Sequence, residues 1–518
     1  MARTEVLVAG AGPTGLVLAL WLAKQGVRLR IIDKGDGSPT TSRALVVHAR
    51  TLELYRQLGI ADEIIKLGHK LRAGNWWASG GYRARAPLGN VAIGVSPYPF
   101  MFILPQDIHE RFLAQKLLDL FGISVERRTE LVDFVDHGTH VSVKLTHYRE
   151  NGVQEAEDCE ALYVAGCDGA GSRVRHVLNI PFSGGTYEQL FYVADIEGSG
   201  KTLNGEGHVN IVPNDFLLVF GYGENGRARL AGRVEAERSK TLSENVTFED
   251  VALHAVEALY IKVEKVNWFS TYHVHHRVAD QFRKGRAFIV GDAGHIHSPA
   301  GGQGMNTGIG DAINLAWKLA AVIHNRAEDS ILDSFDAERR PFAQMLVQTT
   351  DRAFSMVTAN GPIVSFLRTY IVALLLPIVL WIPFVMPRLF RRMSQTNLNY
   401  RGTSLAEGQA GKVFGGDRLP WVAIENGPDN FEPLSTIAWQ VHVYGTAKDE
   451  LVKWCEAQDI ALHPFPWSKV YGKKGLVRDA AYLIRPDSYI AVANVSGRAG
   501  EFDSYLQKRS IRDISTKR

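Results

Sequence analysis

The stretch Val8-Ala9-Gly10-Ala11-Gly12-Pro13-Thr14-Gly15-Leu16 decides the fold of this chain. An apolar run that begins at Glu5 leads into it, and an apolar helical pattern continues to Lys24, where Gly26 ends it. A second apolar run follows and ends at Asp33. The order strand, glycine turn, helix, strand and acid is typical of a parallel α/β sheet that binds a dinucleotide.

Glycines at the first, third and sixth positions of this turn let the backbone bend tightly and approach a pyrophosphate. The N-terminus of the helix offers free N–H groups and the positive end of its dipole. An acid after the second strand can accept hydrogen bonds from ribose hydroxyls. We therefore expect a Rossmann-type domain, although the turn alone does not distinguish FAD from NAD(P). The residues expected at the nucleotide are Gly10, Gly12, Pro13, Thr14, Gly15, Asp33 and Lys34.

The composition excludes several other classes of protein. The chain has 518 residues, enough for roughly two to four domains. Lys and Arg number 58 and Asp and Glu 55, so no basic field indicates a nucleic-acid partner. Cys159, Cys167 and Cys455 have no CxxC spacing, which argues against a disulfide framework and favours a reducing, cytoplasmic location. Paired histidines occur without acids or cysteines in register, so no metal is expected.

Two later segments each place an acid beside a glycine after an apolar strand. The first is Asp168-Gly169, which follows Tyr163–Cys167. The second is Gly291-Asp292, which follows Ala287–Val290 and precedes a glycine-rich loop and a helix. Together with the glycine turn they make three motifs in a fixed order along the chain.

In these three motifs the chain resembles the single-component FAD-dependent aromatic hydroxylases, the family typified by para-hydroxybenzoate hydroxylase and phenol hydroxylase. The resemblance implies an α/β FAD-binding domain with an inserted antiparallel sheet that binds the substrate. Alternating β-type segments between 182 and 278 fit that insertion. Residues 401–518 resemble the thioredoxin-like domain of phenol hydroxylase, pentachlorophenol 4-monooxygenase and the aromatic polyketide hydroxylases, through Gly415–Arg418 and Ala481–Ile490.

The expected organisation has four parts. The FAD-binding domain covers 1–181 and 279–360, the substrate-binding sheet 182–278, an apolar helical connector 361–400 and the thioredoxin-like domain 401–518. Because the last part lacks a CxxC pair, we expect it to be structural or dimer-forming rather than redox-active. A homodimer is therefore expected.

The resemblance also assigns residues to the cofactor. Asp292 would bond the ribityl chain of FAD, and Asp168 would serve both FAD and NAD(P)H. Backbone N–H groups at the start of the following helix would meet the N1/C2=O edge of the flavin and stabilise negative charge on the reduced ring. Pro299 would lie between flavin and substrate. Beyond the nucleotide turn, the implied set is Arg43, Gln106, Asp168, Gly291, Asp292, Pro299, Gly304, Met305 and Asn306.

The activity implied is hydroxylation of an aromatic substrate. NAD(P)H, with NADPH favoured, reduces FAD, and O2 then forms a C4a-hydroperoxyflavin that transfers oxygen to a phenolic or polycyclic, polyketide-like ring. Phenol hydroxylase carries an aspartate where this chain has Leu45, which argues against a simple phenol. His48, Tyr222, Tyr272 and Pro299 are the candidate catalytic residues, and the first three also fit purely structural roles.

An alternative interpretation starts from the uncharged run 371–387, which is near the lower length limit for crossing a bilayer. Three prolines interrupt this run and arginines flank both of its ends, so a domain connector is expected rather than a membrane span. Peripheral membrane contact through this run would instead fit a flavin epoxidase or hydroxylase that acts on a prenylated or lipid-like substrate. A flavin-loaded scaffold that binds a protein partner is the third alternative.

Overall fold

The computed structural model describes most of the chain. The described residues are 2–37, 44–78, 81–89, 92–150, 152–212, 215–222, 226–234, 246–298, 301–358, 382, 384–424 and 427–515. Arg43, Pro299 and most of the run 371–387 lie outside them, so the predictions made for these positions stay predictions. Within the described ranges, no helix combines the length and apolar character needed to cross a membrane.

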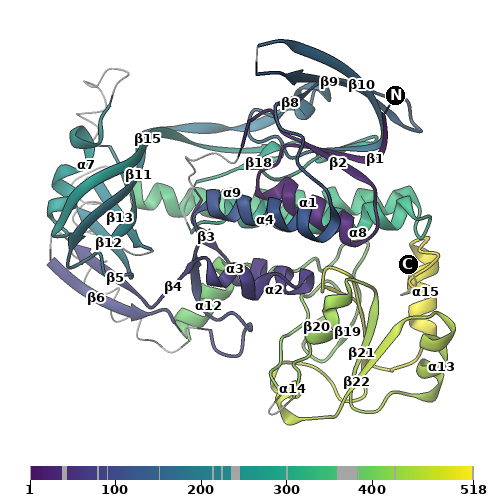
Figure 1. Ribbon diagram of the computed structural model, residues 1–518. Helices are drawn as coiled ribbons and strands as arrows, with labels where there is room; N and C mark the ends of the chain where they lie inside the picture. Colours follow the sequence, from purple (N-terminus) through teal and green to yellow (C-terminus); the bar gives the residue numbers. More distant parts are fainter. Residues whose placement is uncertain are drawn as a thin grey trace.

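A seven-stranded sheet forms the centre of the first domain (Figure 1). Its main path runs in the order β16-β17-β10-β1-β2, and β9 joins β10 to β8. Strands β17, β10, β1 and β2 pair in parallel with one another along this path, whereas β16 pairs antiparallel with β17. Val6–Ala9 of β1 and all of β17 are buried, as expected of a sheet covered on both faces. The bounds are β1 Ala2–Ala9, β2 Leu29–Ile32, β8 Thr129–Asp136, β9 Val141–Tyr148, β10 Gln154–Gly166, β16 Arg283–Lys284 and β17 Ala287–Ile289.

The register of these parallel strands brings the three sequence motifs together. Ala9 pairs with both Ile32 and Gly166, and Gly166 pairs with Ile289. The residues that follow these positions therefore leave the sheet at the same carboxyl edge. In open α/β sheets, ligands bind in the crevice at this edge.

A layer of helices packs on this sheet. α1 (Pro13–Lys24) contacts α4 (Gln106–Phe121) and α8 (Gly304–Ile323), and α8 contacts α9 (Asp333–Thr358). Figure 1 shows the layer between the seven-stranded sheet and the short helices α2 (Ala49–Leu58) and α3 (Ala61–Lys66). α8 begins at Gly304, directly after the glycine-rich loop, as the order of the sequence motifs indicated. The remaining elements of this region are β3 Val46–Val47, β4 His69–Leu71, β7 Met101–Ile103, α5 Arg173–Val177, η1 Gly291–Ala293, η2 Asp329–Leu332 and α12 Val385–Met393.

An eight-stranded sheet occupies the left of Figure 1, with strand order β18-β15-β11-β14-β13-β12-β5-β6. Antiparallel strands were expected between 182 and 278, and β11 to β15 provide them. Two strands from earlier in the chain, β5 and β6, complete the sheet, and the sequence reasoning missed them because β5 joins β12 only through long-range parallel pairing. The bounds are β5 Ala73–Ala78, β6 Gly81–Pro87, β11 Phe182–Gly200, β12 Gly207–Val212, β13 Asp215–Gly221, β14 Arg227–Arg233, α7 Phe248–Glu257, β15 Ile261–Ala279 and β18 His295–Ile296.

The C-terminal domain contains a six-stranded mixed sheet in the order β20-β19-β24-β23-β21-β22. Burial raises the pKa of the lone Cys455 thiol to about 12, so this thiol stays protonated near neutral pH. The assignment of this domain as thioredoxin-like stays a prediction. Its elements are β19 Glu407–Ala410, β20 Val413–Phe414, η4 Glu432–Thr436, β21 Gln440–Tyr444, α13 Asp449–Ala457, β22 Ala461–Phe465, α14 Lys469–Lys473, β23 Ala481–Ile484, β24 Ile490–Asn494 and α15 Gly500–Lys508.

Buried charges join the C-terminal domain to the helical layer. Glu338 on α9 accepts hydrogen bonds from Arg485 at 2.6 and 3.0 Å and from Lys318 on α8 at 2.9 Å. Arg485 also pairs with Asp487 at 2.6 Å, and Trp317 donates to the same carboxylate at 3.1 Å. Glu338, Lys318 and Arg485 have fully buried side chains. Removing one partner from such a cluster leaves another charge buried without compensation.

Glu338 provides a test of this junction. Burial by itself raises the pKa of its carboxyl group, but Arg485 and Lys318 lower it from the usual 4.5 to about 2. Because this pKa is lower in the folded protein, the group stabilises the fold above its unfolded pKa, and that contribution is lost as the pH falls through the folded pKa. We expect the free energy of unfolding to decrease between about pH 4.5 and about pH 2. Glu338→Gln should lower it by about 3–5 kcal/mol near neutral pH.

Urea unfolding followed by tryptophan fluorescence at a series of pH values measures both effects. Glu450→Gln, which removes an exposed charge on α13, is the control and should unfold like the wild type. An unchanged urea midpoint for Glu338→Gln near neutral pH would contradict the stabilising role of this cluster.

Candidate functional site

The glycine turn between β1 and α1 is shaped by two close backbone contacts. Gly10 has φ +101°, and a Cβ atom there would lie 2.3 Å from the carbonyl oxygen of Cys167. A Cβ atom on Gly15 would lie 1.9 Å from the carbonyl oxygen of Gly10. At Gly12, by contrast, a Cβ atom would meet no described atom within 4 Å. The first and third glycines of the motif are therefore required by packing, and the middle one faces open space at the N-terminus of α1.

Asp33 organises the same turn. Its Oδ2 accepts a hydrogen bond from the backbone N–H of Ala11 at 2.7 Å, and its Oδ1 accepts one from Gly35 at 2.8 Å. Lys34 is exposed beside it. Pro13 occupies the first turn of α1, where its missing N–H costs no helical hydrogen bond, and no side chain caps the helix N-terminus. The backbone N–H groups of that terminus are the groups that bind an anion.

Asp168 lies at the neighbouring strand end. Its Oδ2 accepts a hydrogen bond from the backbone N–H of Val174 at 3.1 Å and so caps α5. Its Oδ1 is buried and has no hydrogen-bond partner among the described residues. A buried acceptor without a partner is costly unless a ligand or water supplies a donor.

The loop Gly291-Asp292 is positioned by Asp311, a residue that the sequence reasoning missed. Asp311 Oδ2 accepts from the backbone N–H of Gly291 at 3.2 Å and lies 2.6 Å from His295 Nε2, while Oδ1 accepts from Arg339 at 2.6 Å. Burial alone raises the pKa of the Asp311 carboxyl group, but Arg339 and His295 lower it. Asp292 itself is exposed at the sheet edge. The signal that could have identified Asp311 is an acid within the otherwise small and apolar start of α8.

The first turns of α8 pack directly on the nucleotide turn. A Cβ atom on Gly308 would lie 2.4 Å from Thr14 Oγ1, and one on Gly291 would lie 2.7 Å from the same atom. Thr14 therefore packs α1 against both α8 and the Gly291 loop. No side chain caps the N-terminus of α8 at Gly304, and Met305 packs partly buried against the core.

The side chain of Asn306 has a structural role of its own. Its Oδ1 accepts from the backbone N–H of His48 and from Thr51 Oγ1, both at 2.8 Å. Its Nδ2 donates to the carbonyl oxygens of Val46 and Gly302, both at 2.9 Å. Because this amide is satisfied within the protein, only the backbone of Asn306 is left to meet a cofactor.

His48 lies beside the loop that leads into α8. Its side chain is buried, and burial lowers its pKa to about 4, although hydrogen bonds to the backbone of Gly302 and Gly301 oppose the shift. Its Nε2 has no partner among the described residues. The imidazole is therefore neutral near pH 7 and borders the predicted flavin position.

The other predicted residues lie in different surroundings. Gln106 donates to Glu110 at 2.7 Å at the start of α4. The Tyr222 hydroxyl donates to Asp195, and Arg229 pairs with the same carboxylate at 2.7 and 2.6 Å. Arg229 also donates to the carbonyl oxygen of Ala44 at 3.0 Å, so this group joins the eight-stranded sheet to the first domain.

The structure separates the two candidate tyrosines. Tyr222 packs in a cluster with Val46 and Ile103 of the first domain. Tyr272 packs with Phe191 and Val274 in a separate cluster of the eight-stranded sheet. Burial raises the pKa of Tyr222, so its hydroxyl stays protonated near neutral pH.

The edge of the seven-stranded sheet fits FAD. It offers open space at Gly12, an uncapped helix N-terminus, the unpartnered Oδ1 of Asp168 and the exposed carboxylate of Asp292. A second uncapped N-terminus, that of α8, begins at Gly304 nearby. Within the described part of the chain, no group of three His, Cys, Asp or Glu residues could hold a metal ion.

Comparisons with known proteins show that the chain has an FAD-binding domain. Residues 3–350 match the family described as FAD binding domain. A 6-methylpretetramide 4-monooxygenase from Streptomyces rimosus is 34% identical over 69% of this chain, and the matched segment spans 63% of that enzyme's length. A flavin-dependent monooxygenase from Mycobacteroides abscessus is 31% identical over 95% of this chain and 98% of its own. The solved anhydrotetracycline hydroxylase of Streptomyces rimosus is 26% identical, has a TM-score of 0.76 and aligns over 98% of this chain and 99% of its own. The predicted α/β FAD-binding fold is confirmed.

Variants of Asp292 and Asp311 should separate an effect on FAD affinity from an effect on the stability of the fold. Asp292→Ala removes an exposed carboxylate, so we expect the melting temperature without FAD to change little, while FAD affinity falls at least tenfold, or about 1.4 kcal/mol. Asp311→Ala should lower both the melting temperature and the FAD affinity, because it leaves the buried Arg339 without its carboxylate partner.

Flavin content by visible absorbance and thermal unfolding measure the two effects. Asp119→Asn on α4 serves as an exposed control. Full flavin occupancy in Asp292→Ala would rule out its assignment to FAD.

Proposed function

Because the chain belongs to the FAD binding domain family and is an FAD-dependent monooxygenase, we propose that it uses O2 and NAD(P)H, preferably NADPH, to hydroxylate an aromatic substrate with fused rings. The observation that supports this most directly is the convergence of the glycine turn, the Gly291-Asp292 loop and the N-terminus of α8 at one sheet edge. The names of two relatives, a 6-methylpretetramide 4-monooxygenase and an anhydrotetracycline hydroxylase, support the fused-ring substrate class.

When bound, FAD would supply two-electron transfer from NAD(P)H to O2, so that one oxygen atom enters the substrate and the other leaves as water. The protein supplies the surroundings. The N-terminus of α8, which no side chain caps, directs its positive dipole toward the predicted flavin edge and stabilises negative charge there. The buried, neutral His48 adds a polar group without adding a charge.

We place the substrate between the eight-stranded sheet and this flavin edge. Tyr222 supports the placement, because its cluster contains Val46, whose carbonyl oxygen accepts from Asn306 of α8. The protonated hydroxyl of Tyr222, which Asp195 holds by a hydrogen bond, can orient a substrate oxygen while Tyr222 remains uncharged. Tyr272, in its separate cluster, is a more remote candidate for substrate contact. Pro299 completes the proposed set beside the ring.

Two finer expectations remain predictions. A homodimer was expected from the resemblance of the C-terminal domain. A prenylated or lipid-like substrate at a membrane surface would depend on the run 371–387, which lies almost wholly outside the described residues.

A substrate panel tests the proposed reaction. We expect the purified protein to be yellow, and its NADPH oxidation to accelerate at least tenfold with a fused-ring phenolic substrate and far less with phenol or a prenylated aromatic. Product formation measured by mass spectrometry, with incorporation of one atom from ¹⁸O2, distinguishes hydroxylation from unproductive NADPH oxidation. Acceleration without an oxygenated product for any class would contradict the proposal.

The pH profile tests the neutral state of His48. Because burial lowers its pKa from 6.5 to about 4, protonation sets in only as the pH falls toward 4. We expect kcat/KM to show no ionisation of His48 between about pH 5.5 and about pH 8. His48→Gln should keep the shape of the profile while lowering the rate, and a break near pH 6.5 that this variant abolishes would show that the imidazole titrates during turnover.

A further inference from the structure

The helix α12 and the residue before it present a basic and apolar outer face. On the inner side of the helix, Met386 packs against the cluster around Val46, and Phe390 is buried in the core, so these two side chains attach the helix to the first domain. At about 100° per residue, the exposed side chains fall within an arc of about 160° whose centre points away from Phe390. These side chains, which we call the α12 face, are Phe384, Arg388, Leu389, Arg391 and Arg392.

The three arginines of the α12 face have no acidic partner. Arg388 stacks over the ring of Phe384 at 5.0 Å, and none of the three guanidinium groups forms an ion pair with a described residue. The sequence explains this, because it contains no Asp or Glu between Asp351 and Glu407. A chain with a net charge of only +3 therefore concentrates uncompensated positive charge at this helix.

The C-terminal domain extends the basic surface. Lys474, at the end of α14, donates a hydrogen bond to the carbonyl oxygen of Gly94. Burial and the positive charge of nearby Arg391 lower the pKa of Lys474, so the two cations lie close together. Lys473 is exposed on α14, and Ile93, beside Gly94, is 74% exposed. Figure 1 shows α12 and α14 on the lower side of the view, so both domains contribute cations to one surface.

The apolar side chains of this surface indicate which anion it binds. Guanidinium groups suit phosphate, which both nucleic acids and phospholipid headgroups carry. Phe384 is 59% exposed and Leu389 is 43% exposed, and a nucleic acid would leave both in water. The boundary between the headgroups and the acyl chains of a bilayer takes up basic and apolar side chains together. The combination therefore favours a lipid surface.

We propose that the α12 face, together with Lys473, Lys474 and Ile93, binds the surface of a membrane that contains anionic phospholipids. The cations lie at the headgroup phosphates, and the apolar side chains reach the layer beneath them. Each Lys or Arg near such a surface contributes about fivefold in affinity, so the three arginines together contribute about a hundredfold. The inference rests on exposed side chains and does not depend on the flavin reaction.

Flotation of the FAD-loaded protein with lipid vesicles tests this. We expect binding to vesicles of equal parts phosphatidylcholine and phosphatidylglycerol, little binding to phosphatidylcholine alone, and weaker binding at high salt. A variant with Arg388→Gln, Arg391→Gln and Arg392→Gln should bind the mixed vesicles about a hundredfold more weakly.

The matched control carries Arg3→Gln, Lys144→Gln and Arg173→Gln. These substitutions remove the same charge from exposed positions around the seven-stranded sheet, which lies at the top of Figure 1, so this variant should bind like the wild type. A third variant, with Phe384→Ser and Leu389→Ser, keeps every charge and should bind the mixed vesicles at least tenfold more weakly, because apolar burial is lost.

Five outcomes would overturn the proposal: no flotation with the mixed vesicles, equal flotation with phosphatidylcholine alone, equal weakening by the two triple variants, unchanged binding by the serine variant, or tighter binding of a DNA duplex than of the vesicles. The last would assign the surface to a nucleic acid. Because every substituted side chain is exposed, loss of the fold is not expected, and thermal unfolding of each variant checks this. Substrate-dependent hydroxylation is measured separately, so failure to bind vesicles leaves the proposed reaction standing.

Discussion

Asp311 and Lys318, two charged side chains on the buried face of α8, must each be paired because an isolated charge cannot be accommodated without water. Asp311 meets Arg339 at 2.6 Å, and Lys318 meets Glu338 at 2.9 Å. Both partners lie on α9, so the pairing aligns the two helices. Glu338 then binds Arg485 of the C-terminal domain, and Asp311 binds the loop that contains Gly291. α8 therefore positions α9, the C-terminal domain and the loop that contains Gly291.

The same helix presents its N-terminus to the edge where we propose that the flavin binds. Asn306 in its first turn fixes β3, His48 and α2 through three hydrogen bonds, which places the neutral His48 beside the predicted ring position. The charge clusters further along α8 keep this terminus aligned with Thr14 and Gly291. The groups that hold α8 in the core therefore also orient the helix dipole that we propose stabilises the reduced cofactor.

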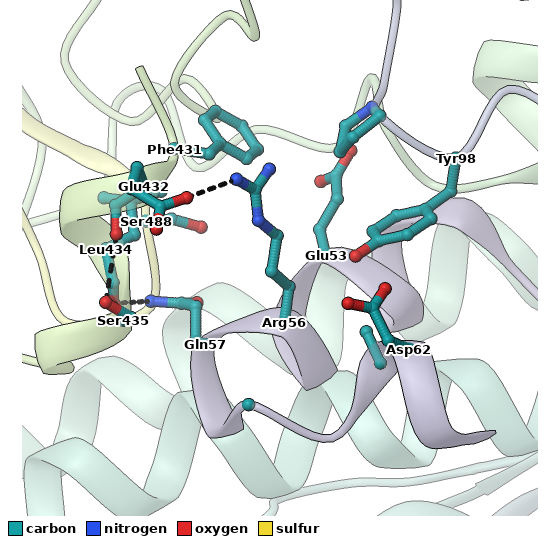
Figure 2. Close-up of a pocket in the computed structure, with 13 residues that line it drawn as sticks. Glu53, Arg56, Gln57, Asp62, Tyr98, Phe431, Glu432, Leu434, Ser435 and Ser488 are labelled. Carbon is teal, nitrogen blue, oxygen red and sulfur yellow. Dashed lines mark hydrogen bonds and ion pairs between the residues drawn. The ribbon is translucent and has the colours of Figure 1, made fainter. Parts of the chain in front are cut away.

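The junction with the C-terminal domain is more polar than a typical core. Arg418 of that domain forms a double hydrogen bond with the buried Glu53 of α2, at 2.6 and 2.8 Å. A cavity of about 520 Å³ lies in this junction (Figure 2), and α2 extends from it to His48. His48, at the N-terminus of α2, and Gln57, near its C-terminus, have eight residues between them in the sequence.

Local signals in the sequence were enough to predict the Rossmann-type sheet and its glycine turn, and the resemblance in the three motifs indicated the FAD-binding family. Gly10 and Gly15 can be recognised in the sequence because their backbones approach other backbone atoms so closely that no side chain fits. The antiparallel strands between 182 and 278 were predictable for a similar reason, since alternation of side chains is a local property. Other features depended on residues far apart in the chain: the pairing of β5 with β12, the partners of Asp311 and Glu338, and the cavity beside Gln57. The sequence by itself therefore determined that this protein builds an FAD-binding α/β sheet, and only the tertiary structure decided which buried charges support it, because the energy of a buried charge is set by its neighbours in space.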